Sequence, residues 1–309
     1  MNAPSRLGIY ALLFAMPLFF VSNLVIGRAV THAVEPGTLA FWRWFLASLM
    51  LLPFAWRGLA HHVAEFRALW RELIWLGTLG MVICGAGVYL SLRYTTASNA
   101  ALIYSSSAIS IVLLEAFFYR ERLSASRLIG TLIGFCGVAV IILHGELTRL
   151  LTWQFGIGDI GIALCAIAWA IYSVILKRKE LKALPTLPLF AAITIAGWVT
   201  VAPFMLFELY AYGAFPHGEK QWLAILALAL FPSVIAFGLY QILVKYAGPS
   251  LTGMSLYLLP VYGVALAVLT LGERVYAYHA IGLALVLAGI ALATEPFKKT
   301  EPFKKKRVA

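Results

Sequence analysis

Charged side chains are scarce in this sequence. Asp, Glu, Lys and Arg make up 12% of its 309 residues, whereas hydrophobic residues make up 62%, and the mean hydropathy is +0.90. A soluble domain of this length needs far more polar surface. Apolar runs of about 20 residues recur along the chain, and this is the length with which a helix crosses a bilayer. The composition therefore excludes an ordinary soluble domain and predicts an all-α membrane protein.

The sequence also has little that would support catalysis or metal binding. Its three cysteines lie in apolar runs, at Cys84, Cys136 and Cys165. Their number and spacing fit neither a disulfide framework nor a zinc site, so we interpret them as small packing residues. His61 and His62 are adjacent and cannot share a helix face, so we expect no metal site there. A Walker-type phosphate loop and a convergent set of acid, base and nucleophile are both missing. We therefore expect no cofactor, and we favour neither an ATP-driven pump nor an enzyme.

Ten apolar segments have the length of a membrane span. We predict spans at residues 8–30, 38–56, 73–92, 98–119, 126–144, 158–176, 187–207, 222–244, 251–271 and 276–294. The segments between them are short, so no soluble domain is inserted. Residues 295–309 form a polar, basic tail in which EPFKK occurs twice. Its composition predicts disorder, and its lysines are suited to contact anionic lipid headgroups.

Basic residues are concentrated on one side of the predicted membrane. They gather in residues 57–71, 120–127 and 177–182 and in the tail, which all share one side with the amino terminus. An excess of Lys and Arg marks the cytoplasmic side, so both termini are predicted to be cytoplasmic. We interpret the net charge of +11 as an orientation signal, and no nucleic-acid partner is expected.

One stretch of the sequence occurs twice. Residues 94–139 align without a gap with residues 246–291, a shift of 152 positions. Each copy has the pattern of two apolar helices joined by a Glu-Arg turn, at residues 121–122 in the first copy and 273–274 in the second. A repeat of this length predicts a chain made of two related halves.

The number of spans determines how these halves are oriented. Five spans per half is an odd number, so the two halves must cross the membrane in opposite senses. We predict a first repeat at residues 1–149 and a second, inverted repeat at residues 150–294. Inverted repeats are typical of alternating-access transporters, which hold the substrate near the midplane between the halves. The predicted architecture is ten transmembrane helices, as two inverted five-helix repeats around a central cavity.

Two charged residues, Arg43 and Glu115, lie at least four residues inside the ends of predicted spans, where a charge is costly and points to function. Arg43 is suited to meet a substrate carboxylate; alternatively, it pairs with a helix end or with Glu35 and orders the outer gate. Glu115 is a candidate for proton coupling. The alternative for Glu115 is that it snorkels to the interface or pairs with Arg120 or Arg122.

Uncharged candidates complete the predicted site. Tyrosines at span depth need hydrogen-bond partners, so we do not expect them to face lipid broadly. A cavity lined by Trp and Tyr suits a flat apolar side chain or an organic cation. An asparagine amide can hold an amino or a carboxylate group. The candidates for the substrate site are Asn23, Trp42, Arg43, Tyr89, Tyr104, Ser107, Trp169, Tyr172, Tyr240 and Tyr257. Helix packing is the alternative for each aromatic residue and for Ser107. Pro17 and Pro260 interrupt spans and are candidates for gating kinks.

The combined pattern resembles the drug/metabolite transporter superfamily, in its EamA branch. The matching features are the two Glu-Arg turns, each followed by glycine-spaced helices, and a run from Phe20 to Asn23 that leads to Arg28. Phe20 replaces the tryptophan that is usual in this family, whereas Trp169 keeps it in the second half. Within the branch, the chain looks most like the YddG aromatic amino-acid exporters. The resemblance implies a basket of ten helices in a bacterial inner membrane, with no prosthetic group.

The expected function is therefore secondary transport. We predict export of amino acids, aromatic ones in particular or other small metabolites, by alternating access. One alternative is a broad exporter of drugs, organic cations or other metabolites of the same superfamily. A phosphorylated cargo carries two negative charges, and the single embedded cation, Arg43, does not balance them. An integral-membrane enzyme is the remaining alternative. The expected partners are a small-molecule substrate and membrane lipid.

Overall fold

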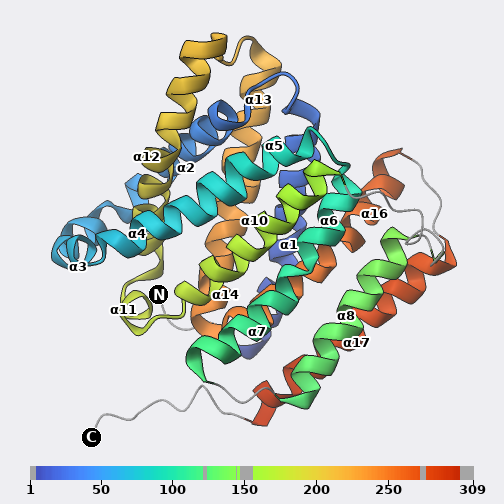
Figure 1. The fold of residues 1–309 in the computed structure, drawn as a ribbon. Helices are drawn as coiled ribbons and strands as arrows, with labels where there is room; N and C mark the ends of the chain where they lie inside the picture. Colours follow the sequence, from blue (N-terminus) through green and yellow to red (C-terminus); the bar gives the residue numbers. More distant parts are fainter. Residues whose placement is uncertain (1–4, 121–123, 144, 147–155, 272–275, 300–309) are drawn as a thin grey trace, which may run out of the picture.

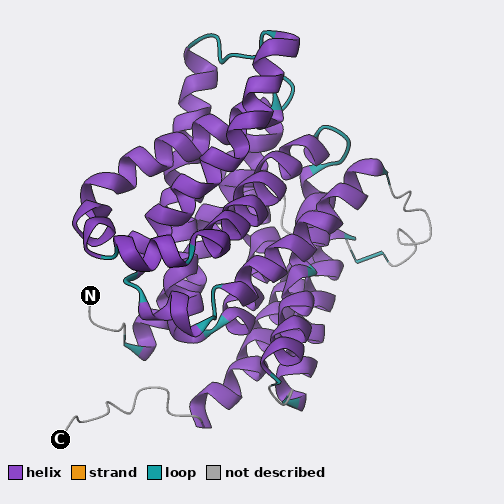
Figure 2. Ribbon diagram, turned by 60° about the vertical axis from the view of Figure 1, so that its left-hand side comes forward, coloured by secondary structure: helices purple, strands orange, loops and turns teal. Residues whose placement is uncertain are grey.

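The computed structural model describes residues 5–120, 124–143, 145–146, 156–271 and 276–299. The regular elements in these ranges are helices joined by short turns (Figure 2). Seven of them are long and apolar enough to cross a membrane: Arg6–Val30, Pro36–His61, Trp70–Leu92, Asn99–Tyr119, Ile157–Ile175, Thr186–Tyr212 and Glu219–Ala247. Two shorter apolar helices cover Ala125–Ile141 and Ala277–Ala293. The chain is therefore an integral membrane protein.

Several of the long helices are built from more than one element. In chain order the elements are α1 (Arg6–Val30), α2 (Pro36–His61), α3 (Val63–Ala68), α4 (Trp70–Gly77), the π-helix η1 (Thr78–Gly87), α5 (Val88–Leu92), α6 (Ala97–Ser105), α7 (Ser107–Tyr119), α8 (Ala125–Ile142), α10 (Ile157–Ile175), α11 (Lys179–Ala183), α12 (Thr186–Tyr212), α13 (Glu219–Leu228), the π-helix η2 (Ala229–Phe237), α14 (Gly238–Ala247), α15 (Pro249–Met254), the 3₁₀ turn η3 (Ser255–Tyr257), α16 (Leu258–Leu271) and α17 (Ala277–Lys299).

The segment predicted as a continuous span at residues 251–271 is broken. It consists of α15, η3 and α16, and the break precedes Pro260 by about one turn. Proline has no N–H to donate to the carbonyl four residues earlier, here that of Leu256 in η3, and this loosens the helix at that point. Pro17 lies inside α1, which continues through it from Arg6 to Val30.

The far ends of three helices lie beyond the predicted span ends. Helix α2 ends at His61, and α12 ends at Tyr212. Helix α17 continues to Lys299 and so includes the first five residues of the tail for which disorder was predicted. The rest of that tail and both Glu-Arg turns lie outside the described residues. The spans were predicted from hydropathy, and a helix does not have to stop where its apolar run stops.

Helices α8 and α17 lie side by side along one edge of the bundle (Figures 1 and 2). Glycines permit this close approach: a Cβ atom on Gly130 would lie 2.6 Å from the carbonyl oxygen of Gly289, and one on Gly137 would lie 2.7 Å from that of Gly282. Small residues at helix contacts are typical of membrane proteins. Gly130 and Gly137 are therefore packing residues at the contact between α8 and α17.

Helices α2 and α12 form a second, antiparallel pair, and this pair carries Arg43. One end is closed by Glu208, which accepts hydrogen bonds from the backbone N–H groups of Gly37 (2.8 Å) and Thr38 (2.7 Å). These N–H groups have no partner within the first turn of α2, and a carboxylate there also suits the positive end of the helix dipole. At the other end, Gly58 lies against the ring of Pro188. These contacts at both ends fix the position of α2 along α12.

Candidate functional site

The site is built around Arg43, whose side chain is 1% exposed. Its Nη1 atom donates to Asn23 Oδ1 on α1 (2.6 Å) and to the hydroxyl of Tyr89 on α5 (2.6 Å). Its Nε atom donates to Ser233 Oγ on η2 (2.5 Å). Tyr89 in turn donates to Asn23 Oδ1 (2.9 Å). Three predicted candidates, Asn23, Arg43 and Tyr89, are therefore in direct contact.

Ser233 was not among the predicted residues, and its role depends on the π-helix η2. Pro232, the residue before it, has no N–H to donate to the carbonyl of Leu228 four residues earlier. The Ser233 hydroxyl donates to that carbonyl (2.7 Å), and its lone pair accepts from Arg43. One hydroxyl therefore contacts both the backbone of the π-helix and the guanidinium. The Pro-Ser pair in an apolar run is the only signal in the sequence that could have indicated this.

The positive charge of Arg43 is not neutralised by any of these partners. All three are uncharged, and Glu35 pairs with Arg93 at 2.9 Å. The prediction that Arg43 pairs with Glu35 is therefore wrong, because the Arg93 side chain is the cation that reaches this carboxylate. The Nη2 atom of Arg43 is buried and has no hydrogen-bond partner among the described residues. Its guanidinium carbon lies 4.7 Å from the Trp44 ring centroid. This cation–π contact stabilises the buried charge less than an ion pair with a carboxylate would.

An aromatic cluster adjoins this cation. The Trp169 ring stacks on Tyr172, with centroids 5.1 Å apart and planes at 18°, and it lies 4.6 Å from Tyr240. Phe237 meets Trp169 edge-on at 5.0 Å and meets Trp44 at 4.8 Å. Phe237 thereby lies between Trp44, whose ring contacts the Arg43 guanidinium, and the rings around Trp169. Trp44 and Phe237 were not predicted, because an apolar aromatic residue in a span has no distinguishing signal.

Two further rings border the cluster. Phe20 of α1 contacts Trp169 edge-on at 5.5 Å, and Tyr104 of α6 lies 6.2 Å from the same ring. The structure thus brings four predicted residues, Tyr104, Trp169, Tyr172 and Tyr240, into one group.

Polar groups border the cluster on one side. The Tyr240 and Ser173 hydroxyls share a hydrogen bond of 2.6 Å, and Gln241 Nε2 donates to the Tyr172 hydroxyl (2.9 Å). The indole Nε1 of Trp169 is buried without a partner among the described residues. Orphaned donors in a buried site are suited to a ligand with acceptor oxygens.

Three predicted residues lie apart from this group or contribute no bond to it. Trp42 packs with Trp222 (5.1 Å) and with Phe215 (5.8 Å), neither of which belongs to the cluster around Trp169. Tyr257 lies against Gly134 of α8 and donates to the carbonyl of Thr131 (3.0 Å), so it holds two helices together. Ser107 is buried, and its hydroxyl has no partner among the described residues.

Glu115 is buried at the end of α7 and joins three segments. Its Oε1 accepts from Lys177 Nζ (2.7 Å), and its Oε2 accepts from the backbone N–H (3.1 Å) and the hydroxyl of Ser250 at the start of α15. The basic partner is Lys177, which follows α10. Arg122 lies outside the described residues.

No metal-binding group of three or more His, Cys, Asp or Glu side chains was found within the described ranges. His62 instead pairs with Glu65, with Nδ1 and Oε1 3.3 Å apart. The pKa of Glu65 is lowered by a backbone hydrogen bond and, next in size, by the hydrogen bond with His62.

A membrane-embedded bundle with a buried cation beside a cluster of rings is typical of one class of protein, the small-molecule membrane transporters. Two segments of the chain, residues 7–143 and 156–294, each match the EamA-like transporter family. The chain therefore belongs to that family, and the resemblance noted in the sequence is confirmed.

Named relatives are also transporters. An uncharacterized transporter of Archaeoglobus fulgidus is 27% identical over 95% of this chain and 98% of its own length. The aromatic amino acid exporter YddG of Ancylobacter novellus is 28% identical over 88% of this chain and 92% of its own. A probable amino-acid metabolite efflux pump of Salmonella typhimurium is 25% identical over 65% and 69%. A solved crystal structure, 26% identical in sequence, superposes with a TM-score of 0.73 over 96% of this chain and 99% of the other.

Proposed function

We propose that this protein exports small molecules that carry a carboxylate and a flat apolar side chain, in particular aromatic amino acids. One observation carries the proposal: Arg43 is buried, and among the described residues it has no carboxylate partner and its Nη2 atom has no hydrogen-bond acceptor. An unpaired buried cation is costly. A substrate carboxylate would supply the missing charge and would accept from Nη2.

The ring cluster supplies the second half of the site. Trp169, Tyr172 and Tyr240 are all fully buried, so a substrate ring enters only if the helices around the cluster separate. The described form thus corresponds to a closed state, and transport requires it to open toward each side in turn. Offset or edge-on contacts between the substrate ring and these side chains would favour aromatic cargo.

Pairs of features in the two halves support the proposed inverted repeats. The π-helices begin at Thr78 and at Ala229, close to equivalent positions under the shift of 152. The break between α6 and α7 at Ser106 corresponds in the same way to the start of α16 at Leu258. We propose ten spans in two inverted halves, residues 1–149 and 150–294, around a central cavity. We place the protein in a bacterial inner membrane with both termini cytoplasmic.

The names of two relatives support an amino-acid cargo. The YddG relative is named as an aromatic amino acid exporter, and the Salmonella relative as a probable amino-acid metabolite efflux pump. Both cargo classes include molecules with a carboxylate, which agrees with the uncompensated charge of Arg43. Export of organic cations is the second candidate, favoured by the ring cluster and opposed by the neighbouring guanidinium.

Uptake into liposomes tests the proposal. We expect labelled phenylalanine to enter vesicles that hold the protein faster than labelled threonine, and faster than it enters empty vesicles. Trp169→Ala should lower phenylalanine uptake about tenfold, the size of a lost aromatic contact, while Trp169→Phe keeps most of it. Gel filtration of both variants controls for folding.

Two results would contradict the proposal. If no amino acid moves faster than into empty vesicles, amino-acid transport is excluded. If labelled tetraphenylphosphonium enters and phenylalanine does not, the organic-cation alternative replaces it.

A further inference from the structure

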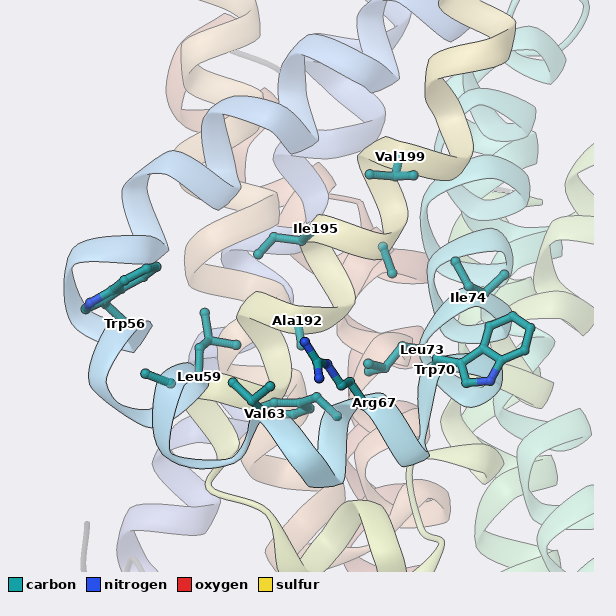
Figure 3. Close-up of a pocket in the computed structure, with 13 residues that line it drawn as sticks. Trp56, Leu59, Val63, Arg67, Trp70, Leu73, Ile74, Ala192, Ile195 and Val199 are labelled. Atoms are coloured by element: carbon teal, nitrogen blue, oxygen red, sulfur yellow. The ribbon is translucent and has the colours of Figure 1, made fainter.

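A groove of about 660 Å³ opens on the side of the bundle, away from the Arg43 site. It lies between the end of α2, α3, the start of α4 and the middle of α12 (Figure 3). Its thirteen lining residues are Trp56, Leu59, Ala60, Val63, Phe66, Arg67, Trp70, Leu73, Ile74, Ala192, Ile195, Ala196 and Val199. Arg67 is the only one of them that carries a charge. An apolar groove with a single cation needs an occupant of matching polarity.

The cation lies at one end of the groove. Helix α3 falls between two membrane-spanning helices, Pro36–His61 and Trp70–Leu92, and therefore lies near the membrane surface. Figure 3 shows Arg67 projecting from α3 over the groove toward Ala192 of α12. Within the described part of the chain, the Arg67 side chain makes no hydrogen bond or ion pair. The cation is thus available to an external anion.

The other end of the groove extends into the membrane. From Ala192 to Val199 the lining follows α12 for about 10 Å at the rise of an α-helix. Trp56 and Trp70 flank the surface end and are 66% and 57% exposed, and exposed tryptophans are typical of the headgroup level. The groove is therefore basic and aromatic at the surface and purely aliphatic in depth.

We propose that this groove binds an anionic phospholipid, with its phosphate on Arg67 and one acyl chain along α12. The order of charge, tryptophan belt and aliphatic lining follows the order of headgroup, interface and acyl chain in a lipid. Basic pockets between membrane helices recognise anionic headgroups in this way. A transported amino acid would leave the aliphatic depth empty, and a zwitterionic lipid would leave the charge of Arg67 unmatched.

The test uses the full chain purified in detergent, with phosphatidylglycerol and phosphatidylcholine of identical acyl chains. Native mass spectrometry counts bound lipid, and thermal unfolding reports the concentration of lipid that gives half of the stabilisation. We expect phosphatidylglycerol to bind about fivefold more tightly than phosphatidylcholine, which is the effect of one cation near a lipid phosphate.

Two variants separate the parts of the proposal. Arg67→Gln should remove the preference for phosphatidylglycerol and leave weak binding of both lipids. Val199→Trp should fill the groove and reduce binding of both; Val199 is 45% exposed, so the larger side chain is compatible with folding. Arg120→Gln removes an exposed cation outside the groove and is the matched control.

Three outcomes would overturn the proposal. These are equal binding of the two lipids by the wild type, an unchanged preference in Arg67→Gln, and a loss of preference in Arg120→Gln as large as in Arg67→Gln. None of these measurements involves transport, so the result does not depend on the cargo of the Arg43 site.

Discussion

At the scale of single residues, the chemistry of this protein lies in the surroundings of Arg43. Three uncharged groups orient its guanidinium, and none of them cancels its charge. A buried charge of this kind is costly in a membrane and is kept where it serves a function. The arrangement leaves Nη2 for a ligand.

The first prediction concerns the carboxylate. Phenylethylamine has the ring and amine of phenylalanine without its carboxylate. We expect unlabelled phenylalanine to inhibit uptake by the wild-type protein much more strongly than phenylethylamine does. In Arg43→Gln, the apparent affinity for phenylalanine should fall about 10- to 100-fold, which is the value of a charge-assisted hydrogen bond, while that for phenylethylamine should not change. Competition against labelled phenylalanine in liposomes measures both.

Arg178→Gln is the control for the first prediction, because Arg178 is an exposed cation that pairs with Glu72 at 2.9 Å. Equal losses for phenylalanine and phenylethylamine in Arg43→Gln would show that Arg43 shapes the site without binding the carboxylate.

The second prediction concerns Glu115, which we interpret as a structural lock. Glu115→Gln removes the ion pair between Glu115 and Lys177; the lysine is partly exposed (17%), so the expected loss is about 1–3 kcal/mol, below the value for a fully buried pair. Lys177→Met in the same chain should restore part of it. Thermal unfolding of the single and double variants gives the coupling energy.

Transport under a pH gradient distinguishes the two roles of Glu115. A lock predicts the same response to the gradient in Glu115→Gln as in the wild type. If the variant loses a response that the wild type has, Glu115 carries the coupled proton and the structural interpretation fails.

At the scale of helices, pairs of elements are joined at glycines and at a helix end. Helices α8 and α17 meet at glycines, and α2 and α12 are joined by Glu208 and by Gly58 against Pro188. Hydropathy predicted most of the helices, since an apolar run of sufficient length is a local property. Pro260 marks the break at η3 in the sequence, because a proline loosens the turn before it. The π-helices were not predicted, because they depend on how backbone groups are satisfied in the packed bundle.

The third prediction tests the α8–α17 contact. A Cβ atom on Gly289 would lie 2.5 Å from the carbonyl oxygen of Gly130, whereas one on Gly238 would meet Phe190 at 3.6 Å. Both glycines lie inside helices, so both gain the same helix propensity when replaced by alanine. We expect Gly289→Ala to destabilise the protein by about 1–3 kcal/mol through overpacking.

Gly238→Ala, the matched control, should be neutral or slightly stabilising. Thermal unfolding in one detergent compares the two. Equal melting temperatures of the two variants would mean that α8 and α17 accommodate the added methyl group without loss of stability, contrary to the packing described above.

At the scale of the whole molecule, the proposed mechanism requires two halves that move against each other around Arg43 and Trp169. The site takes residues from both: Asn23, Arg43 and Tyr89 belong to the first half, and Trp169 and Ser233 to the second. A movement that parts the halves therefore opens the site, as alternating access requires.

The fourth prediction concerns orientation. In a variant without its natural cysteines, Tyr210→Cys should react with a membrane-impermeant maleimide added outside intact cells, whereas Val63→Cys should react only after the membrane is permeabilised. Tyr210 is 93% exposed and lies next to a loop with few cations, whereas Val63 lies between basic segments. The opposite labelling pattern would reverse the proposed topology.

The sequence by itself determined the membrane class, the approximate positions of the helices and the family, because hydropathy, span length and internal repeats are properties of contiguous segments. It also singled out Arg43, since a charge in an apolar run is visible without any structure. Only the tertiary structure decided that Arg43 contacts Ser233, 190 positions away, that Glu35 pairs with Arg93, and that Lys177 is the basic partner of Glu115. Which helices become neighbours depends on packing across the bundle, and no local pattern encodes the partner of a buried polar group.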